Sequence, residues 1–298
     1  MRIGVLGNEG SWYVNEICTA ATNRGHFAAE LHFAQQSARI INGKTEFWIG
    51  DQQASELDAL IVRTMPPGSL EQVILRMDFL IALEQAGVRI INSPRSLECA
   101  VDKYLTTQKL AENDIPIPDT IVCETSEIAM DAFELLGRDV VVKPLFGAEG
   151  RGIMRVDHPE MALRTFRTLE RLNTAIYVQR FNRGPMEDIR ILVLDGQVVG
   201  SMKRRPAAGD FRANVAQAGQ AEQYSPNAQE IELAIASAEI TGCVFCGIDL
   251  MYNEQNTAVV IEVNAVPGWR ALEKTCRINI ADHLIQWLES KDTEPNLQ

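Results

Sequence analysis

The sequence contains no long apolar run. No stretch approaches the roughly 18 consecutive apolar residues that a membrane-spanning helix needs, so we expect a chain that does not cross a membrane. The N-terminal segment MRIGVLGNEG has a single arginine and an apolar run too short for a secretion signal. It is typical of a first β-strand, and we expect a cytoplasmic protein.

Positive charge is also scarce. Lys and Arg together number 28 against 40 Asp and Glu, which gives a formal net charge of −12. General nucleic-acid binding requires a basic surface, so this balance argues against it. A local basic pocket for an anionic ligand remains compatible with the composition.

Residues of common nucleophilic and metal sites are few. The four histidines have no metal-ligand spacing, and no G-x-S-x-G pattern occurs, which argues against a hydrolase. The six cysteines are scattered through apolar segments, as expected for reduced thiols. The pair CVFC (243–246) raises the alternative of a metal or redox site. A single C-x-x-C that leads into a strand favours packing instead.

What the N-terminal third does contain is an alternation of strands and helices. Apolar strands are predicted at 2–6, 57–63 and 88–92, separated by helices at 12–23 and 69–87. This order predicts a doubly wound α/β lobe. The first loop lacks the G-x-G-x-x-G pattern, which argues against a dinucleotide site there.

The C-terminal part predicts antiparallel strand pairs. A hairpin at 187–206 turns at an Asp-Gly pair, and segments 244–252 and 257–266 form a final strand pair. A last helix is predicted at 279–290, and the polar stretch 207–224 is expected to be a loop.

A glycine loop follows a strand that ends in a lysine. Lys143 closes an apolar strand, and FGAEGRG (146–152) begins three residues after it. The N–H groups of such a loop can wrap a phosphate chain, although a plain hairpin turn is the alternative. A lysine inside an apolar strand is costly without an anion. Lys103, on a preceding helix, would complete a polyphosphate site if both lysines converge on the loop.

Three oxygen-bearing side chains interrupt the final strand pair. Asp249 lies in CGIDLMY, and Glu262 and Asn264 lie two residues apart in VVIEVN, hence on one strand face. If the strands are antiparallel, the three side chains cluster and suit Mg²⁺. The alternative is that each one is separately hydrogen-bonded or solvated.

Basic residues on and after the hairpin could neutralise a transferring phosphoryl group. They are Arg190, the run Lys203 to Arg205, and Arg212. For Lys203 to Arg205, a solvated hairpin face is the alternative.

In order and content these motifs resemble the ATP-grasp superfamily, and within it the RimK-type α-L-glutamate ligases. The stretches that carry the resemblance run from about Asn92 to Glu289 and include VVVKPLFGAEGRGI, DIRILVLDGQVVGSMKRR, GDFRANV, GIDLM and IEVNAVPGWRALEKTCRINIA. The resemblance implies an α/β fold, α+β in the ATP-grasp lobes. It also implies a Rossmann-like pre-ATP-grasp domain (1–93), a central lobe with a glycine-rich lid (94–180), a C-terminal lobe with the metal site (181–290) and a flexible tail (291–298).

The resemblance also assigns roles to single residues. ATP would be bound by Lys103, Lys143, Gly147, Gly150, Gly152, Gln179, Arg180, Phe181, Asp188, Arg212 and Asn214. Two Mg²⁺ or Mn²⁺ ions would be held by Asp249, Glu262 and Asn264. Catalysis by charge neutralisation would fall to Arg212, Lys143 and Arg190.

The chain departs from the family pattern in two places. Arg180 stands where the adenine-binding linker usually has Glu, and VAQAGQ follows DFRAN where a basic residue and paired glycines are usual. The second region is expected to meet the acceptor, so the ribosomal-protein substrate does not carry over. The tryptophan of PGWRAL resembles the branch that glutamylates pterin or similar coenzymes, and the turn Pro267-Gly268-Trp269 is interpreted as the start of the acceptor wall.

The resulting hypothesis is an ATP-dependent carboxylate–amine ligase that adds an amino acid, expected to be L-glutamate, to a small-molecule, coenzyme or peptide carboxylate. Glutamylation of a protein C-terminus and a non-catalytic nucleotide-binding regulatory module are the alternatives. The expected partners are ATP, the amino acid, an unidentified carboxylate acceptor and further copies of the chain in a dimer or tetramer, with no nucleic acid and no membrane.

Overall fold

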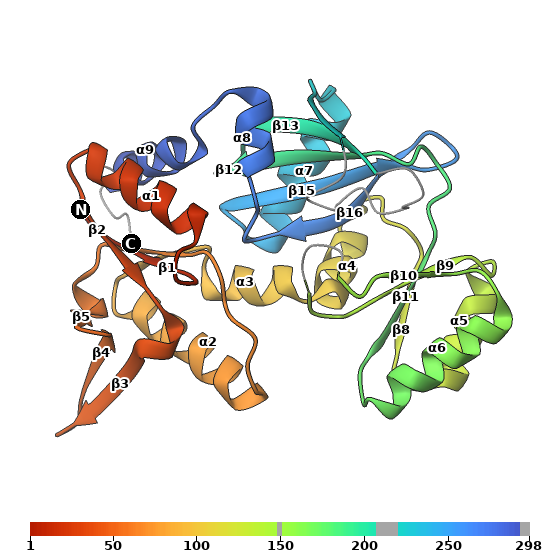
Figure 1. Ribbon diagram of the computed structural model, residues 1–298, viewed down its shortest axis with the longest axis horizontal. Coiled ribbons are helices and arrows are strands. Elements are labelled where there is room, and N and C mark those ends of the chain that lie inside the picture. The colour runs from red at the N-terminus through yellow and green to blue at the C-terminus, as the bar shows by residue number, and fades with distance from the viewer. Residues whose placement is uncertain (148–150, 207–219, 293–298) are drawn as a thin grey trace. The chain divides into compact units, whose positions relative to one another are not determined.

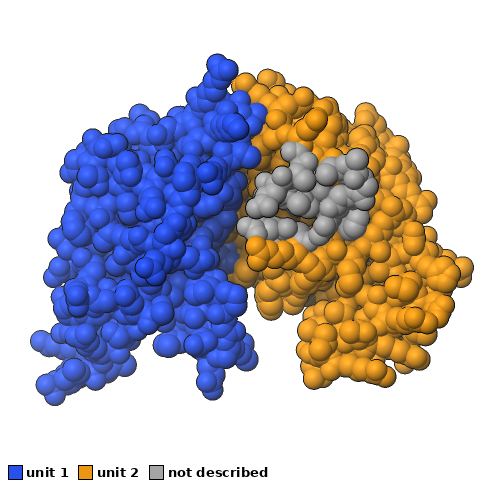
Figure 2. Space-filling model, viewed as in Figure 1, with its two compact units in different colours: residues 1–97, 266–298 blue, residues 98–265 orange. Residues whose placement is uncertain are grey.

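The computed structural model describes residues 1–147, 151–206 and 220–292. The chain divides into two compact units, coloured separately in Figure 2. Unit 1 comprises residues 1–97 and 266–298, and unit 2 comprises residues 98–265. The four-segment organisation implied by the resemblance remains a prediction.

Unit 1 is built on a parallel sheet whose strand order is β2-β1-β6-β7. The strands are β1 (Arg2–Leu6), β2 (Phe27–Leu31), β6 (Ala59–Val62) and β7 (Arg89–Ile91). The connecting helices are α1 (Trp12–Asn23) and α2 (Leu70–Gln85), and α2 begins with a Ser69–Gln72 capping box. The predicted α/β lobe is therefore confirmed, and the elements that were predicted end within two residues of the expected positions, whereas β2 was not predicted.

An antiparallel ribbon that the sequence analysis did not predict is inserted between β2 and β6. It consists of β3 (Gln36–Ile41), β4 (Lys44–Ile49) and β5 (Gln52–Gln53), flanked by the 3₁₀ turns η1 (Phe33–Gln35) and η2 (Ala54–Glu56). Asn42 and Gly43 both have positive φ, 52° and 73°, as a type I′ hairpin turn requires. The Phe47 ring packs edge-on against Phe79 of α2 and ties the ribbon to unit 1.

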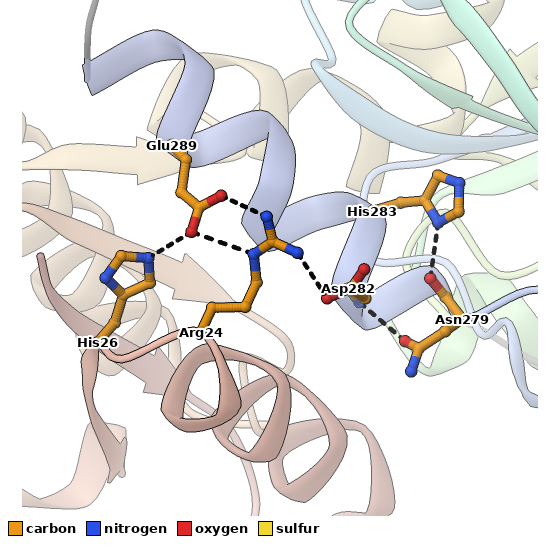
Figure 3. Close-up of polar contacts among 6 residues, drawn as sticks. All are labelled: Arg24, His26, Asn279, Asp282, His283 and Glu289. Atoms are coloured by element: carbon orange, nitrogen blue, oxygen red, sulfur yellow. Dashed lines mark hydrogen bonds and ion pairs between the residues drawn. The ribbon is translucent and has the colours of Figure 1, made fainter.

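The C-terminal segment returns to unit 1 as α8 (Arg270–Cys276) and α9 (Ile280–Asp292). Figure 3 shows the polar contacts that join α9 to the end of α1. The Arg24 guanidinium donates to Glu289 at 2.6 Å and to Asp282 at 3.0 Å, and the His26 ring lies 2.9 Å from Glu289. Arg24 and His26 hold the pKa of the Glu289 carboxyl down at about 2. These contacts fasten the C-terminal helix to the N-terminal strand–helix unit.

Arg63, the residue after β6, is the main buried cation of unit 1. Its side chain donates to the carbonyl oxygen of Pro267 at 2.6 Å. Its guanidinium carbon lies 4.3 Å from the Trp269 ring centroid and 5.2 Å from that of Tyr13. Burial lowers the pKa of Arg63 to about 9. Two aromatic faces and one carbonyl therefore stabilise this charge, and no carboxylate among the described residues pairs with it.

Unit 2 contains two antiparallel sheets (Figure 1). The first has strand order β10-β9-β11-β8 and consists of β8 (Thr120–Cys123), β9 (Val140–Lys143), β10 (Met154–Val156) and β11 (Ile176–Arg180). Helices α5 (Ser126–Leu135) and α6 (Pro159–Arg171) pack on it through a core that includes Phe133 and Phe166.

The second sheet of unit 2 has strand order β14-β13-β12-β15-β16. Its strands are β12 (Asp188–Leu194), β13 (Gln197–Arg205), β14 (Gln220–Gln223), β15 (Phe245–Tyr252) and β16 (Ala258–Asn264). The remaining helices are α3 (Pro94–Val101), α4 (Lys103–Glu112) and α7 (Ala228–Thr241). Both strand pairs predicted from the sequence are present, and the hairpin turn at Asp195-Gly196 has positive φ at both residues.

One prediction about this sheet is wrong in part. The stretch 207–224 was expected to be a loop, but its residues 220–223 form β14 and pair with β13. Backbone pairing to an existing hairpin edge produces this strand, because its own sequence, QAEQ, has little apolar character. Residues 207–219 lie outside the described part of the chain.

Two further expectations concern the state of the cysteines and the absence of a membrane-spanning helix. All six cysteines are present as thiols, and Cys243 and Cys246 are buried where β15 begins. Their mutual hydrogen bond lowers the pKa of Cys243, and the same bond together with burial raises that of Cys246. No helix in the described ranges combines the length and the apolar character needed to cross a membrane.

Candidate functional site

Lys143 ends β9 as a buried cation. Its side chain is 9% exposed, and its Nζ donates to Gln179 Oε1 at 2.7 Å. Burial lowers the pKa of Lys143 to about 8, the positive charge of Lys103 adds to this, and the negative charge of Glu262 acts against it. The ammonium is therefore held in a low-dielectric position with few compensating contacts, which suits a group that meets a polyanion.

Lys103, the first residue of α4, lies beside Glu262 and the start of the glycine loop. Its Nζ donates to the Gly147 carbonyl at 2.9 Å and lies 3.6 Å from Glu262 Oε1. The Asp102 side chain accepts hydrogen bonds from the backbone N–H groups of Tyr104 and Leu105. This cap fixes where α4 begins and therefore the backbone position of Lys103. The two lysines, the glycine loop and Glu262 thus converge, as the polyphosphate hypothesis requires.

Two glycines of the loop, Gly147 and Gly152, adopt backbone conformations that favour glycine. Gly147 has φ of 152° and Gly152 has φ of 76°, conformations that other residues rarely adopt. A Cβ on Gly152 would lie 2.9 Å from Pro144 Cγ, so the loop packs tightly against the strand end. Gly150 lies outside the described residues.

The predicted metal residues are brought together by the pairing of β15 with β16. Figure 1 shows β15 and β16 side by side in their sheet. Asp249 is the direct register partner of Glu262, and Asn264 pairs with Gly247 two residues away on the same face. This sheet face offers two carboxylates and one carboxamide, the oxygen ligands that Mg²⁺ prefers, so the residues fit the ion. No cluster of three or more His, Cys, Asp or Glu side chains suited to a metal occurs in the described ranges, so the carboxamide and nonprotein ligands would have to complete the shell.

Asp249 belongs to a buried network of alternating charge. Arg190 Nε and Nη2 both donate to its carboxylate at 2.7 Å, and Arg204 Nη2 lies 3.0 Å from Oδ1. Arg204 also makes a two-bond contact with Asp188, at 2.5 and 2.8 Å. Asp188 and Arg190 lie on β12, Arg204 on β13 and Asp249 on β15. The register of these strands therefore places acidic and basic side chains alternately beside one another.

The two acids of this network differ in their titration. Burial alone would raise the pKa of Asp249, but Arg190 and Arg204 outweigh it and leave that pKa below its usual value. For Asp188 burial outweighs Arg204, and the neighbouring Asp249 adds to the effect, so its pKa rises to about 6. Asp188, implied to contact the nucleotide, has both oxygens engaged with Arg204 and is 4% exposed.

The linker residues divide between inward and outward side chains. Gln179 is buried, accepts from Lys143 and donates to Thr120 Oγ1 at 3.0 Å. Arg180 points outward to Asp119, 2.9 Å away, and its backbone N–H donates to the Asp119 carbonyl. The Phe181 N–H donates to the Asp139 carbonyl, and Arg155 stacks 3.8 Å above its ring. The N–H groups of Arg180 and Phe181 are therefore both used within the protein.

A chain of hydrogen bonds behind Lys143 was missed by the sequence analysis. Gln179 Nε2 donates to the Tyr177 hydroxyl at 3.2 Å, and that hydroxyl lies 2.8 Å from Thr107 Oγ1. These residues, with Lys103 and Glu262, line a pocket. The same pattern that marked Glu262 and Asn264, two polar residues two apart on a buried strand, also links Tyr177 to the predicted Gln179 and could have revealed Tyr177.

The other predicted site residues lie away from the two lysines and Glu262, or outside the described ranges. Lys203 and Arg205 pair with Glu187 at 2.8 and 3.1 Å, so these two positive charges are neutralised locally. Trp269, interpreted as part of the acceptor wall, is 0% exposed because its indole packs on Arg63 and Tyr13. Its ring therefore packs in the core of unit 1, and the role of the turn as the start of the acceptor wall stays a prediction. Arg212 and Asn214 fall in 207–219, outside the described residues.

Comparison with known proteins places this geometry in context. The family model described as a RimK-like ATP-grasp domain matches residues 100–288. The tetrahydromethanopterin:α-L-glutamate ligase of Methanosarcina acetivorans is 30% identical over 321 residues, covering 97% of this chain and 99% of the relative. A probable α-L-glutamate ligase of Maridesulfovibrio salexigens is 30% identical over 298 residues, covering 99% and 97%. The structure of the ATP-grasp ligase PsnB complexed with minimal precursor superposes with a TM-score of 0.78 at 20% identity, covering 98% of this chain and 99% of that one.

Proposed function

Because this chain belongs to the RimK-like ATP-grasp family, an ATP-dependent ligase family, we propose that its convergent lysines and acids join glutamate to the carboxylate of a small molecule. The chain is an ATP-dependent amide-forming ligase whose relatives add glutamate. The proposal concerns the residues that do this and the acceptor that receives the amino acid.

One observation carries the assignment of the site. Lys103 and Lys143 come from different elements, yet Glu262 lies 3.6 Å from Lys103 and is the acid that most raises the pKa of Lys143. Lys103 also donates to the Gly147 carbonyl of the glycine loop. Two cations beside a carboxylate and a glycine loop are what the phosphate chain of ATP with its divalent ion requires.

The reaction divides into two displacements. A carboxylate oxygen of the acceptor forms a bond to the γ-phosphorus of ATP, and the bond to the β-phosphate oxygen breaks to release ADP. The amino nitrogen of glutamate then forms a bond to the acyl carbon, phosphate leaves with its bonding electron pair, and the nitrogen loses a proton. Lys143 and Lys103 stabilise the phosphate charge, and Arg190 and Arg212 are proposed to neutralise the transferring group, so positioning and charge suffice without a covalent nucleophile.

Asp249, Glu262 and Asn264 would hold the magnesium or manganese ions, two in the proposal. The ions would supply charge neutralisation at the phosphate oxygens. Arg190 orients the Asp249 carboxylate by a two-bond contact and so fixes the direction of its remaining lone pairs.

For the acceptor we propose a coenzyme-like small molecule. The pterin-glutamylating relative covers nearly the full length of the chain, which supports this choice over a protein C-terminus. We also propose a cytoplasmic location, consistent with ATP use and six thiols, and a homo-oligomeric assembly.

The test is ADP release with ATP, Mg²⁺, glutamate and a panel of acceptor carboxylates, followed by mass spectrometry of the products. We expect ADP formation that depends on both substrates and a small-molecule product heavier by a glutamyl residue. Glutamate added to a protein instead would identify the alternative acceptor class. Nucleotide binding without ADP release under any condition would favour the regulatory module and contradict the proposal.

A further inference from the structure

Helix α2 carries an apolar stripe that unit 1 does not cover. Leu70, Ile74, Met77 and Ile81 follow at intervals of four, three and four residues, so at about 100° per residue they lie on one side of the helix. Leu70 is 75% exposed, Ile74 50% and Ile81 39%. The opposite side is buried against unit 1, which leaves α2 apolar on two sides with only one of them packed.

The tip of the β3–β4 hairpin is also apolar and uncovered. Ile40 and Ile41 are 75% and 63% exposed beside the Asn42-Gly43 turn. Figure 1 shows this tip projecting away from the β2-β1-β6-β7 sheet. The contact of Phe47 with Phe79 holds the base of the hairpin, so the tip is presented on a supported ribbon.

The two surfaces carry opposite charges. The hairpin tip, residues 39–44, contains Arg39 and Lys44, and Glu46 is the cross-strand partner of Arg39, so this end of the ribbon carries a net positive charge. On α2, Glu71 and Asp78 are exposed beside the stripe, and the only basic residue of the helix, Arg76, is buried and donates to the Pro66 carbonyl. Each surface therefore matches the other in apolar character and complements it in charge.

We propose that the hairpin tip of one copy docks onto the α2 stripe of a second copy, and that the second copy reciprocates, giving a two-fold symmetric dimer. Reciprocal docking uses both uncovered surfaces of each copy and closes the assembly. Pairing of α2 with its own equivalent is disfavoured because Glu71 and Asp78 would meet the same acids. This inference concerns unit 1 alone and is independent of the catalytic proposal.

Charge reversal provides the decisive experiment, with mass measured by light scattering and sedimentation over about 1–100 µM. One variant carries Arg39→Glu and Lys44→Glu, and the other carries Glu71→Lys and Asp78→Lys. Each alone is expected to dimerise at least about 100-fold more weakly than the wild type, because its tip and stripe now repel. Mixing the two variants is expected to restore a dimer containing one copy of each, since both contacts then join opposite charges.

Several outcomes overturn the proposal. A monomeric wild type at every concentration does so. An unweakened Arg39→Glu/Lys44→Glu variant would show that the hairpin tip is not used, as in pairing through α2 alone. An unweakened Glu71→Lys/Asp78→Lys variant would show that α2 is not used, as in edge pairing through β3.

Two further variants guard against misfolding. Arg39 stacks 4.6 Å from the Trp48 ring centroid, so its reversal could unsettle the hairpin. Ile41→Asp leaves that contact intact and is expected to give a monomer with an unchanged melting temperature. The matched control is Leu135→Asp, at a 74% exposed leucine of α5 in unit 2, which is expected to leave the dimer mass unchanged. Equal mass for Ile41→Asp and the control would contradict the proposal.

Discussion

The two units bury positive charge in different ways. In unit 1, Arg63 is stabilised by the faces of Trp269 and Tyr13 and by the Pro267 carbonyl. In unit 2, Arg190, Asp249, Arg204 and Asp188 alternate in charge along a chain of three ion pairs.

The difference shows what each arrangement can do. The aromatic faces and the carbonyl hold the Arg63 guanidinium in the core of unit 1 without neutralising its charge. A network of ion pairs is costly to desolvate, and its energy depends on every partner being present. In unit 2 this cost is accepted around Asp249, the residue predicted to hold a metal.

The largest effect is expected from breaking the network of unit 2. Arg204→Met removes one cation from two buried acids and is expected to lower the free energy of unfolding by about 3–5 kcal/mol, because Asp188 and Asp249 lose a shared partner. Denaturant unfolding measures this. Arg205→Met, a half-exposed neighbour on the same strand, is the control, with an expected change within about 0–1 kcal/mol. Equal effects would show that the network adds nothing.

The next effect tests whether the acids of this sheet serve catalysis. Glu262→Gln keeps the side-chain shape but removes the charge opposite Lys103 and Asp249, and we expect kcat to fall about 10²–10³-fold with a small change in stability. Steady-state ADP release and calorimetric Mg²⁺ titration measure it. Glu254→Gln, exposed between β15 and β16, should leave both readouts unchanged. A wild-type rate for Glu262→Gln would refute the metal assignment.

A smaller effect is expected from the corresponding change in unit 1. Arg63→Met replaces the buried cation with an apolar side chain and leaves only the Pro267 carbonyl without its donor, so we expect a loss of about 1–3 kcal/mol. Denaturant unfolding of this variant beside Arg204→Met gives the comparison directly. A loss in Arg63→Met larger than in Arg204→Met would reverse the comparison between the units.

The smallest effect concerns pH. Burial lowers the pKa of Lys143 to about 8, so the free enzyme carries this positive charge below pH 8 and loses it above. We expect kcat/KM for ATP to fall up to about tenfold per pH unit above pH 8, because the neutral amine binds phosphate weakly. In Lys143→Arg this inflection should disappear, since arginine stays protonated. Persistence of the inflection in that variant would assign it to another group.

Much of the fold could be predicted because strong local patterns produced it. The alternation of apolar strands with helices predicted β1, β6 and β7 of the unit 1 sheet but not β2, and the Asp-Gly turn predicted the β12–β13 hairpin. The β3–β4 ribbon and β14 were missed because their strands are polar or exposed and owe their pairing to neighbours.

The sequence by itself determined which residue types are available for the chemistry and where along the chain they occur. Spacing of two residues on a strand already placed Glu262 and Asn264 on one face. Only the tertiary structure decided which of these side chains meet, because strand register sets Asp249 opposite Glu262, and the start of α4 brings Lys103 to Gly147. It also decided that Trp269 is buried and Arg180 faces outward, since both depend on partners distant in sequence, Arg63 and Asp119. Local composition encodes periodicity, whereas contacts between distant segments depend on how those periodic elements pack.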